Sequence, residues 1–152
     1  MKRILITGAA SGIGLATARH FHDNGWRVGL TDVNDTALAE LAATLNDSWY
    51  RRLDVTDSIA CQHACRDFAE DGCIDVLFNC AGILRMGPFE SISAEQHRQI
   101  IDINVTGSFI CARAAFARMR AQDPQGGRII NNGSVSAYVP RWGSAPYTAS
   151  KH

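Results

Sequence analysis

Residues 4–14 read Ile-Leu-Ile-Thr-Gly-Ala-Ala-Ser-Gly-Ile-Gly, and this stretch decides the fold. The short apolar run Ile4–Ile6 is typical of a buried strand, and the glycines after it are typical of a tight turn into a helix. We expect the helix to extend from Gly12 to Asn24 and to end at Gly25. The free N–H groups at the start of this helix then lie at the end of a strand, which is an arrangement that attracts phosphate groups.

Apolar runs alternate with amphipathic, helix-length stretches along the rest of the chain. The further strands are expected at 28–30, 50–53, 74–78 and 128–131, and the further helices begin at Asn34 or Asp35, at Asp57 and at Ser93 and extend to about 45, 69 and 121. This alternation predicts an α/β fold, a doubly wound parallel sheet with helices on both faces and ligands at the carboxyl ends of the strands. No linker or repeat interrupts the chain, so residues 1–152 are expected to form one domain.

The composition excludes several classes of protein. The 152 residues include 15 basic and 15 acidic side chains, and this balance argues against binding to nucleic acid or to an anionic membrane. No stretch approaches the ~20 apolar residues of a membrane span, and the apolar run after Met1 is too short for a signal peptide. The five cysteines are expected to be reduced, buried thiols of a cytoplasmic protein. No metal site is expected, because Cys61, His63 and Cys65 lack the fourth ligand that zinc needs.

The three glycines of the turn suit three different tasks in binding a dinucleotide. Gly8 can form the tight turn, Gly12 can let a pyrophosphate approach the backbone, and Gly14 can let the helix pack closely on the sheet. An ordinary glycine-rich connection between a strand and a helix would explain the same residues.

Asp32 lies 18 residues after Gly14, at the end of the second expected strand. An acidic side chain in this place accepts hydrogen bonds from the ribose hydroxyls of an adenosine and repels a 2′-phosphate. No lysine or arginine lies in the glycine turn or next to Asp32 in the sequence, so NAD is predicted over NADP. A role as a helix cap is the alternative explanation for Asp32.

The spacing of the glycine turn resembles that of the short-chain dehydrogenase/reductase family, and further motifs of that family follow in order. These motifs are Asp54-Val55, Asn79-Cys80-Ala81-Gly82, Asn104 in the long helix, Ser134, and Tyr147-Thr148-Ala149-Ser150-Lys151. The resemblance covers essentially the whole chain and implies a Rossmann-like fold.

The resemblance also implies an NAD-dependent oxidoreductase that transfers hydride between a nicotinamide and a secondary alcohol or carbonyl substrate. The residues expected to bind the cofactor are Gly8, Ser11, Gly12, Ile13, Gly14, Asp32, Asp54, Val55, Asn79, Ala81, Gly82, Tyr147 and Lys151. Ser134 would orient the substrate oxygen, Tyr147 would transfer a proton, and Asn104 would support a water-mediated proton path behind Lys151. A tyrosine has an ordinary pKa of about 10, and the ammonium of a lysine one helical turn away favours its ionised form.

Three departures from the family pattern shape the remaining expectations. Cys80 replaces an asparagine of the family motif, and Gly133 replaces a serine. The sequence ends at His152, so we expect a fold truncated after the fifth strand, weak NAD binding, little turnover and weaker self-association than in the family. A non-catalytic dinucleotide-binding module is the alternative. Tyr138 and Trp142 could line a substrate pocket or lie in an exposed loop.

Overall fold

The computed structural model describes residues 1–152 and contains one sheet of five parallel strands in the order β3-β2-β1-β4-β5. The strands are β1 (Arg3–Thr7), β2 (Arg27–Asp32), β3 (Trp49–Arg52), β4 (Val76–Asn79) and β5 (Arg128–Asn131). The helices are α1 (Gly12–Asp23), α2 (Asp35–Thr44), α3 (Ser58–Phe68), α4 (Ala94–Ile101), α5 (Ser108–Ala121) and α6 (Ala145–Lys151), with the helical turns η1 (Phe89–Ser91), η2 (Asp102–Gly107) and η3 (Val135–Ala137). The predicted doubly wound parallel sheet is confirmed.

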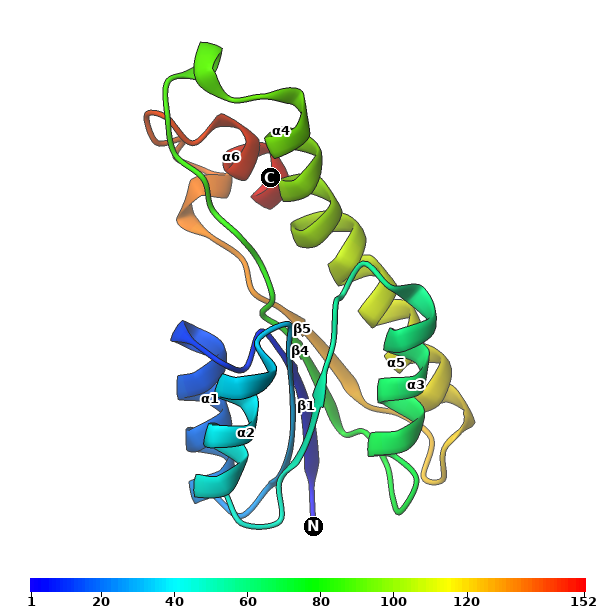
Figure 1. The fold of residues 1–152 in the computed structure, drawn as a ribbon. Helices are drawn as coiled ribbons and strands as arrows, with labels where there is room; N and C mark the ends of the chain where they lie inside the picture. The colour runs from blue at the N-terminus through cyan, green and yellow to red at the C-terminus, as the bar shows by residue number, and fades with distance from the viewer.

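Helices cover both faces of the sheet. α1 and α2 lie on one face, and α3 and α5 lie on the other (Figure 1). Successive residues of β1 point to opposite faces, as a strand requires, and the strand is buried along its whole length. Ile4 and Ile6 pack in the core under α1 and α2, whereas Leu5 packs with Phe68 in the core under α3 and α5. The unbroken apolar run is therefore the consequence of burial on both sides.

Side chains cap three of the helices where the sequence indicates a start. The Asn34 side chain accepts a hydrogen bond from the Ala37 N–H at 3.2 Å, so Asn34 is the cap of α2 and Asp35 is its first residue. Asp57 caps α3. Ser93 and Gln96 form the expected capping box at the start of α4.

The predicted long helix is continuous but contains one wide turn. α4 leads into η2, a π-helical turn, which leads directly into α5. By length and composition alone, the 28 residues Ala94–Ala121 could cross a membrane, which corrects the expectation that no stretch approaches such a span. In the fold this helix packs against α3, β4 and α6, and it extends from the sheet to the region beyond the strand ends (Figure 1).

Two details at one side of the sheet complete the architecture. β4 begins at Val76 and not at Ile74 as predicted, because the backbone N–H and C=O of Ile74 bond to the Gln122 side chain at 2.9 and 3.0 Å. β5 is an edge strand, and its Ile130 is exposed.

The cysteines correct the expectation that all thiols are buried. Cys61, Cys65 and Cys111 lie in the core, whereas Cys73 and Cys80 are partly exposed, and all are free. Burial raises the pKa of the Cys65 thiol to about 12. Cys61 contacts Cys111, with 3.5 Å between the two sulfur atoms. No group of three or more His, Cys, Asp or Glu side chains is placed to share a metal ion.

Candidate functional site

A cavity of about 620 Å³ opens at the carboxyl ends of the strands. It lies where the chain crosses from one side of β1 to the other, which is the place where open α/β sheets bind ligands. Its lining comprises Gly8, Ser11, Gly12, Ile13, Asp32, Val33, Leu53, Asp54, Val55, Cys80, Ala81, Gly82, Ile83, Gln99, Ile103 and Asn132. Most of the residues expected to bind a cofactor are therefore neighbours in space. The sequence did not predict a binding role for the lining residues Leu53, Ile83, Gln99, Ile103 and Asn132.

The glycines of the turn have the geometry that their predicted tasks need. Gly8 has a φ of 70°, and a Cβ there would lie 2.8 Å from the Cα and N of Ala81. A Cβ at Gly14 would overlap the carbonyl of Gly8, so α1 can start this close to the strand only with glycine. Gly12 has a φ of 52° with no atom within 4 Å of its Cβ position, which leaves its backbone open toward a ligand.

The first turn of α1 offers backbone N–H groups without side-chain partners. Ser11 precedes this helix in an extended conformation, and its hydroxyl caps no N–H group. The N–H groups of a first helical turn have no partner within the helix, and they carry the positive end of the helix dipole. Gly12 and Ile13 therefore present donors to the cavity that they line.

The Asp32 carboxylate is fixed in place by backbone donors. The Ala10 N–H donates to one oxygen at 3.1 Å, and the Asn34 N–H donates to the other at 3.0 Å. Since Asn34 caps α2, the alternative role of Asp32 as the cap of that helix is excluded. The carboxylate connects the glycine turn to the end of β2 and lines the cavity.

The fold pairs Asp32 with a basic residue, Arg52, that is not its neighbour in the sequence. Asp32 and Arg52 are directly paired across β2 and β3, and the Arg52 Nε donates to the carbonyl of Val33 at 3.2 Å. The sequence places the two residues 20 positions apart, so only the register of the strands reveals this proximity.

The floor of the cavity is built from the ends of β1 and β4. The Thr7 hydroxyl accepts hydrogen bonds from the N–H groups of Cys80 and Ala81, each at 3.1 Å. Asn79, expected beside a cofactor, does not line the cavity. Its Nδ2 donates to Asn131 Oδ1 at 2.9 Å and to the carbonyl of Ser108 at 3.1 Å, so it joins β4 to β5 and α5.

Asn104 is a buried junction between three segments. Its Oδ1 accepts from the Ile83 N–H at 2.8 Å, and its Nδ2 donates to the Ile83 carbonyl and the Ser150 hydroxyl, both at 2.9 Å. Ser150 in turn donates to the carbonyl of Tyr147 at 2.7 Å. The π turn η2 carries Asn104, and such turns are frequent at functional sites. Sequence reasoning missed Ser150, because only the docking of α6 on α4 shows its role.

The remaining expected catalytic residues lie beyond the strand ends, Ser134 directly before η3 and Tyr147 and Lys151 on α6. Lys151 Nζ donates to the Asn132 carbonyl at 2.9 Å, and it lies 5.8 Å from the centre of the Tyr147 ring. Ser134 accepts from the Ser136 N–H at 3.1 Å. Lys151 therefore reaches the cavity through Asn132, whereas no hydrogen bond joins Ser134 to Tyr147.

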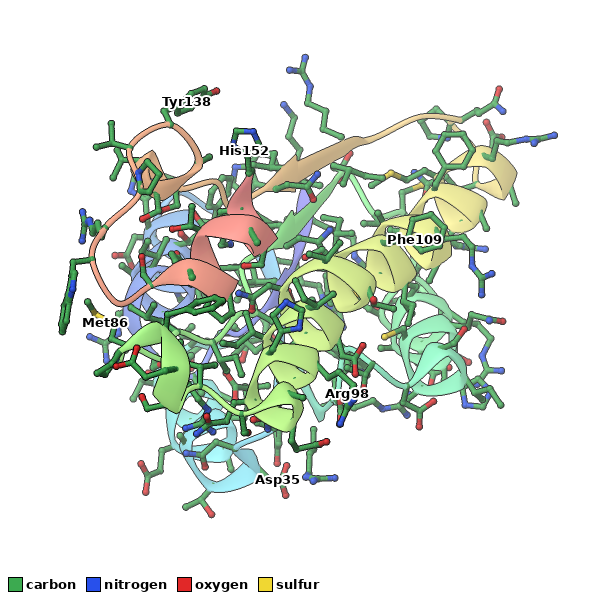
Figure 2. All side chains as sticks on the ribbon, turned by 90° about the horizontal axis from the view of Figure 1, so that it is seen from above. Asp35, Met86, Arg98, Phe109, Tyr138 and His152 are labelled. Carbon is green, nitrogen blue, oxygen red and sulfur yellow. The ribbon has the colours of Figure 1, made fainter.

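A second cavity of about 650 Å³ lies next to α6, and Phe89, Trp142 and Thr148 are among its lining residues. Tyr138 does not line it and is 88% exposed, extending away from the body of the protein (Figure 2). Of the two expected aromatic residues, Trp142 borders this cavity but is itself 81% exposed, and Tyr138 belongs to an exposed loop.

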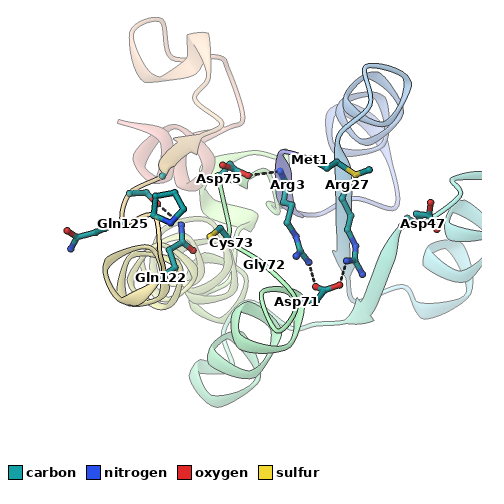
Figure 3. Close-up of a pocket in the computed structure, with 14 residues that line it drawn as sticks. Met1, Arg3, Arg27, Asp47, Asp71, Gly72, Cys73, Asp75, Gln122 and Gln125 are labelled. Carbon is teal, nitrogen blue, oxygen red and sulfur yellow. Dashed lines mark hydrogen bonds and ion pairs between the residues drawn. The ribbon is translucent and has the colours of Figure 1, made fainter.

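A larger cavity of about 990 Å³ lies at the opposite end of the strands, around the starts of β1 and β2 (Figure 3). The charges in this cavity neutralise one another, because the side chains of Arg3 and Arg27 both bind the Asp71 carboxylate. The backbone N–H of Arg3 also donates a hydrogen bond to the Asp75 carboxylate at 2.7 Å. The hydrogen bonds from Arg27 and Arg3 lower the pKa of Asp71 to about 2. This arrangement joins the starts of β1 and β2 to the turn that precedes β4.

The low pKa of Asp71 predicts how stability depends on pH. The contribution of this carboxylate is present above its unfolded pKa of about 3.9 and is lost as the pH falls toward about 2. We expect wild-type protein to lose more free energy of unfolding than Asp71→Asn between pH 5 and pH 2, measured by urea denaturation. Asp47→Asn, in the same cavity but outside the ion pairs, should follow the wild type. Parallel curves for wild type and Asp71→Asn would contradict the role of this carboxylate.

The parallel sheet and the cavity at its switch point define a Rossmann-like α/β protein. Residues 2–152 match the family described as short chain dehydrogenase, and the chain belongs to this family. The chain is 36% identical to 2,5-dichloro-2,5-cyclohexadiene-1,4-diol dehydrogenase LinX of Sphingobium indicum, over 99% of the chain and 61% of the relative. It is 37% identical to D-threitol dehydrogenase of Mycolicibacterium smegmatis, over 99% of the chain and 59% of the relative.

A solved structure gives the same result for the fold. The crystal structure of gox2181 superposes with a TM-score of 0.92 at 29% sequence identity, over 99% of this chain and 61% of that one. The chain thus spans about 60% of the length of these relatives.

Proposed function

We propose that the protein binds a nicotinamide dinucleotide and transfers hydride between it and a secondary alcohol or carbonyl compound. The observation that carries this proposal is the cavity at the strand ends, which the uncapped start of α1 and the fixed carboxylate of Asp32 both line. The donors of Gly12 and Ile13 suit a pyrophosphate, and Asp32 suits the hydroxyls of the adenosine ribose. Asp54 and Val55 line the part of the cavity suited to adenine. NAD is the proposed cofactor.

The remaining residues suit proton transfer at a substrate oxygen. When bound, a nicotinamide ring supplies or accepts the hydride. Tyr147 would exchange the proton with the substrate oxygen, and the Lys151 ammonium lies 5.8 Å from the centre of its ring. Ser134 would orient the substrate oxygen. Asn104 would fix the position of α6 through Ser150, since both polar atoms of its side chain already have protein partners.

The relatives suggest the class of substrate. Three relatives between 34% and 37% identical are named for diol or polyol substrates, including the meso-2,3-butanediol dehydrogenase of Serratia marcescens. We propose a small diol as the substrate. We also propose a cytoplasmic location, because the free cysteines are typical of proteins in a reducing compartment.

NADH fluorescence and a turnover assay together test the proposed function. The chain should enhance the emission of NADH in a saturable titration, and with NAD it should oxidise one or more members of a panel that contains meso-2,3-butanediol, D-threitol and cyclohexane-1,2-diol. Binding without oxidation of any diol or simple alcohol would favour a non-catalytic dinucleotide-binding module. Absence of NADH binding would contradict both functions.

We also propose self-association through the outer face of the long helix. Val105, Phe109 and Phe116 are exposed there at helical spacing, and Figure 2 labels Phe109 on α5. Exposed apolar side chains gathered on one helix face are typical of a contact surface. Light scattering of the purified protein distinguishes a monomer from a dimer or a larger assembly.

A further inference from the structure

Arg52 is a basic residue that the fold places beside Asp32, although it is not among the residues that line the cavity. It ends β3 directly opposite Asp32 at the end of β2. Paired residues of neighbouring parallel strands place their side chains on the same face of the sheet. Arg51 points to the other face, where it binds Asp67 at 2.7 Å and lies over the Trp49 ring. Arg52 is thus the arginine of β3 that shares a face with Asp32.

The Arg52 side chain is anchored but not neutralised. Its Nε donates to the Val33 carbonyl at 3.2 Å, and the terminal nitrogens of its guanidinium have no hydrogen-bond or ion-pair partner. Val33 and Asp32 both line the cavity. Asp32 uses its two oxygens for the N–H groups of Ala10 and Asn34 and forms no ion pair with Arg52. A guanidinium with free donors is therefore anchored to the carbonyl of Val33, the residue that follows Asp32 in the chain.

The charges around this position have opposite effects on a 2′-phosphate. A phosphate monoester carries about −1.5 to −2 charges at pH 7, so the Asp32 carboxylate repels it. The Arg52 guanidinium attracts it and can donate two hydrogen bonds to its oxygens. Two other carboxylates lie near this end: Asp54, which accepts from the Thr56 hydroxyl and N–H, and Asp35 at the start of α2. The carboxylates favour an unphosphorylated ribose, and Arg52 opposes them.

We propose that Arg52 is a specificity-determining residue that allows the ribose subsite to accept a dinucleotide with a 2′-phosphate. This inference rests on the proposed function and refines it: Asp32 keeps NAD preferred, and Arg52 keeps NADP as a weaker ligand of the same cavity. The protein then discriminates between the two dinucleotides less strongly than an acidic residue alone would dictate.

Equilibrium titrations with NADH and NADPH, followed by cofactor fluorescence, test this proposal. In Arg52→Gln we expect the dissociation constant for NADPH to rise about tenfold, while that for NADH changes less than about twofold. Arg51→Gln is the matched control, because it removes the same charge from the other face of the strand and should leave the ratio of the two constants unchanged. Asp32→Asn should shift the ratio the opposite way, toward NADPH. Added salt should weaken NADPH more than NADH in the wild type and equally in Arg52→Gln.

The outcomes separate this proposal from the proposed function. Equal changes for NADH and NADPH in Arg52→Gln, or no change in either, would overturn the role of Arg52 and leave NAD binding intact. Wild-type protein that binds NADH but shows no NADPH affinity would also overturn it. Wild-type protein that binds neither dinucleotide would overturn the proposed function, and the role of Arg52 with it.

Discussion

Tyr147→Phe should lower the rate of alcohol oxidation about 100- to 10,000-fold and leave the affinity for NADH within about twofold. The substitution removes only the hydroxyl that would exchange a proton with the substrate. The aromatic ring stays beside Lys151, and Lys151 keeps its hydrogen bond to the Asn132 carbonyl at the edge of the cavity. Initial rates of NADH formation with a diol substrate, measured beside an NADH titration, report the two effects separately.

Tyr138→Phe is the control for this experiment. It makes the same chemical change at a tyrosine that is 88% exposed and lies outside both cavities of the strand-end region. Its rate should match that of the wild type. Equal rates for Tyr147→Phe and the wild type would remove Tyr147 from proton transfer, and a parallel loss of NADH affinity would indicate a structural role instead.

Gly14→Ala should destabilise the protein by about 3 kcal/mol and abolish measurable NADH binding. The new Cβ would overlap the carbonyl of Gly8, which belongs to the backbone and cannot rotate away as a side chain could. α1 would have to move away from β1, and the donors at its start would move with it. Urea denaturation followed by circular dichroism measures the stability, and fluorescence measures the binding.

Gly133→Ala is the matched control for the glycine turn. Gly133 has no atom within 4 Å of its Cβ position and no positive φ, so alanine there should change stability by less than about 0.5 kcal/mol. A Gly14→Ala protein as stable as Gly133→Ala, with unchanged NADH affinity, would show that the turn tolerates a side chain and that the predicted task of Gly14 is wrong.

The features that the sequence predicted well are local. The order of strands and helices follows from apolar runs and caps, and the tasks of Gly8 and Gly14 follow from a turn of eight residues. The glycine turn and Asp32 come together because the turn follows β1 and Asp32 ends β2, and these two strands are neighbours in the sheet. The β-α-β pattern already predicts this pairing.

The features that the sequence did not predict depend on long-range geometry. Arg52 is paired with Asp32 through the register of β2 and β3, and Ser150 bonds to Asn104 because α6 docks against η2. The apolar pattern predicted one regular helix from Ser93 to about residue 121. It did not reveal the π turn at 102–107 within that helix. Asn79 ends a strand as Asp32 does, but the neighbouring β5 and α5 accept the hydrogen bonds of its side-chain Nδ2.

The hydrogen bond from the Ala10 N–H to Asp32 links the proposed site for the ribose to the proposed site for the diphosphate. One oxygen of Asp32 holds the loop that would surround the diphosphate. Removing the carboxylate should therefore make that loop more mobile, in addition to changing which dinucleotide binds better. Replacing Asp32 alone to change the preferred coenzyme should therefore lower the affinity for both dinucleotides. A successful redesign has to supply a new hydrogen-bond acceptor for the Ala10 N–H.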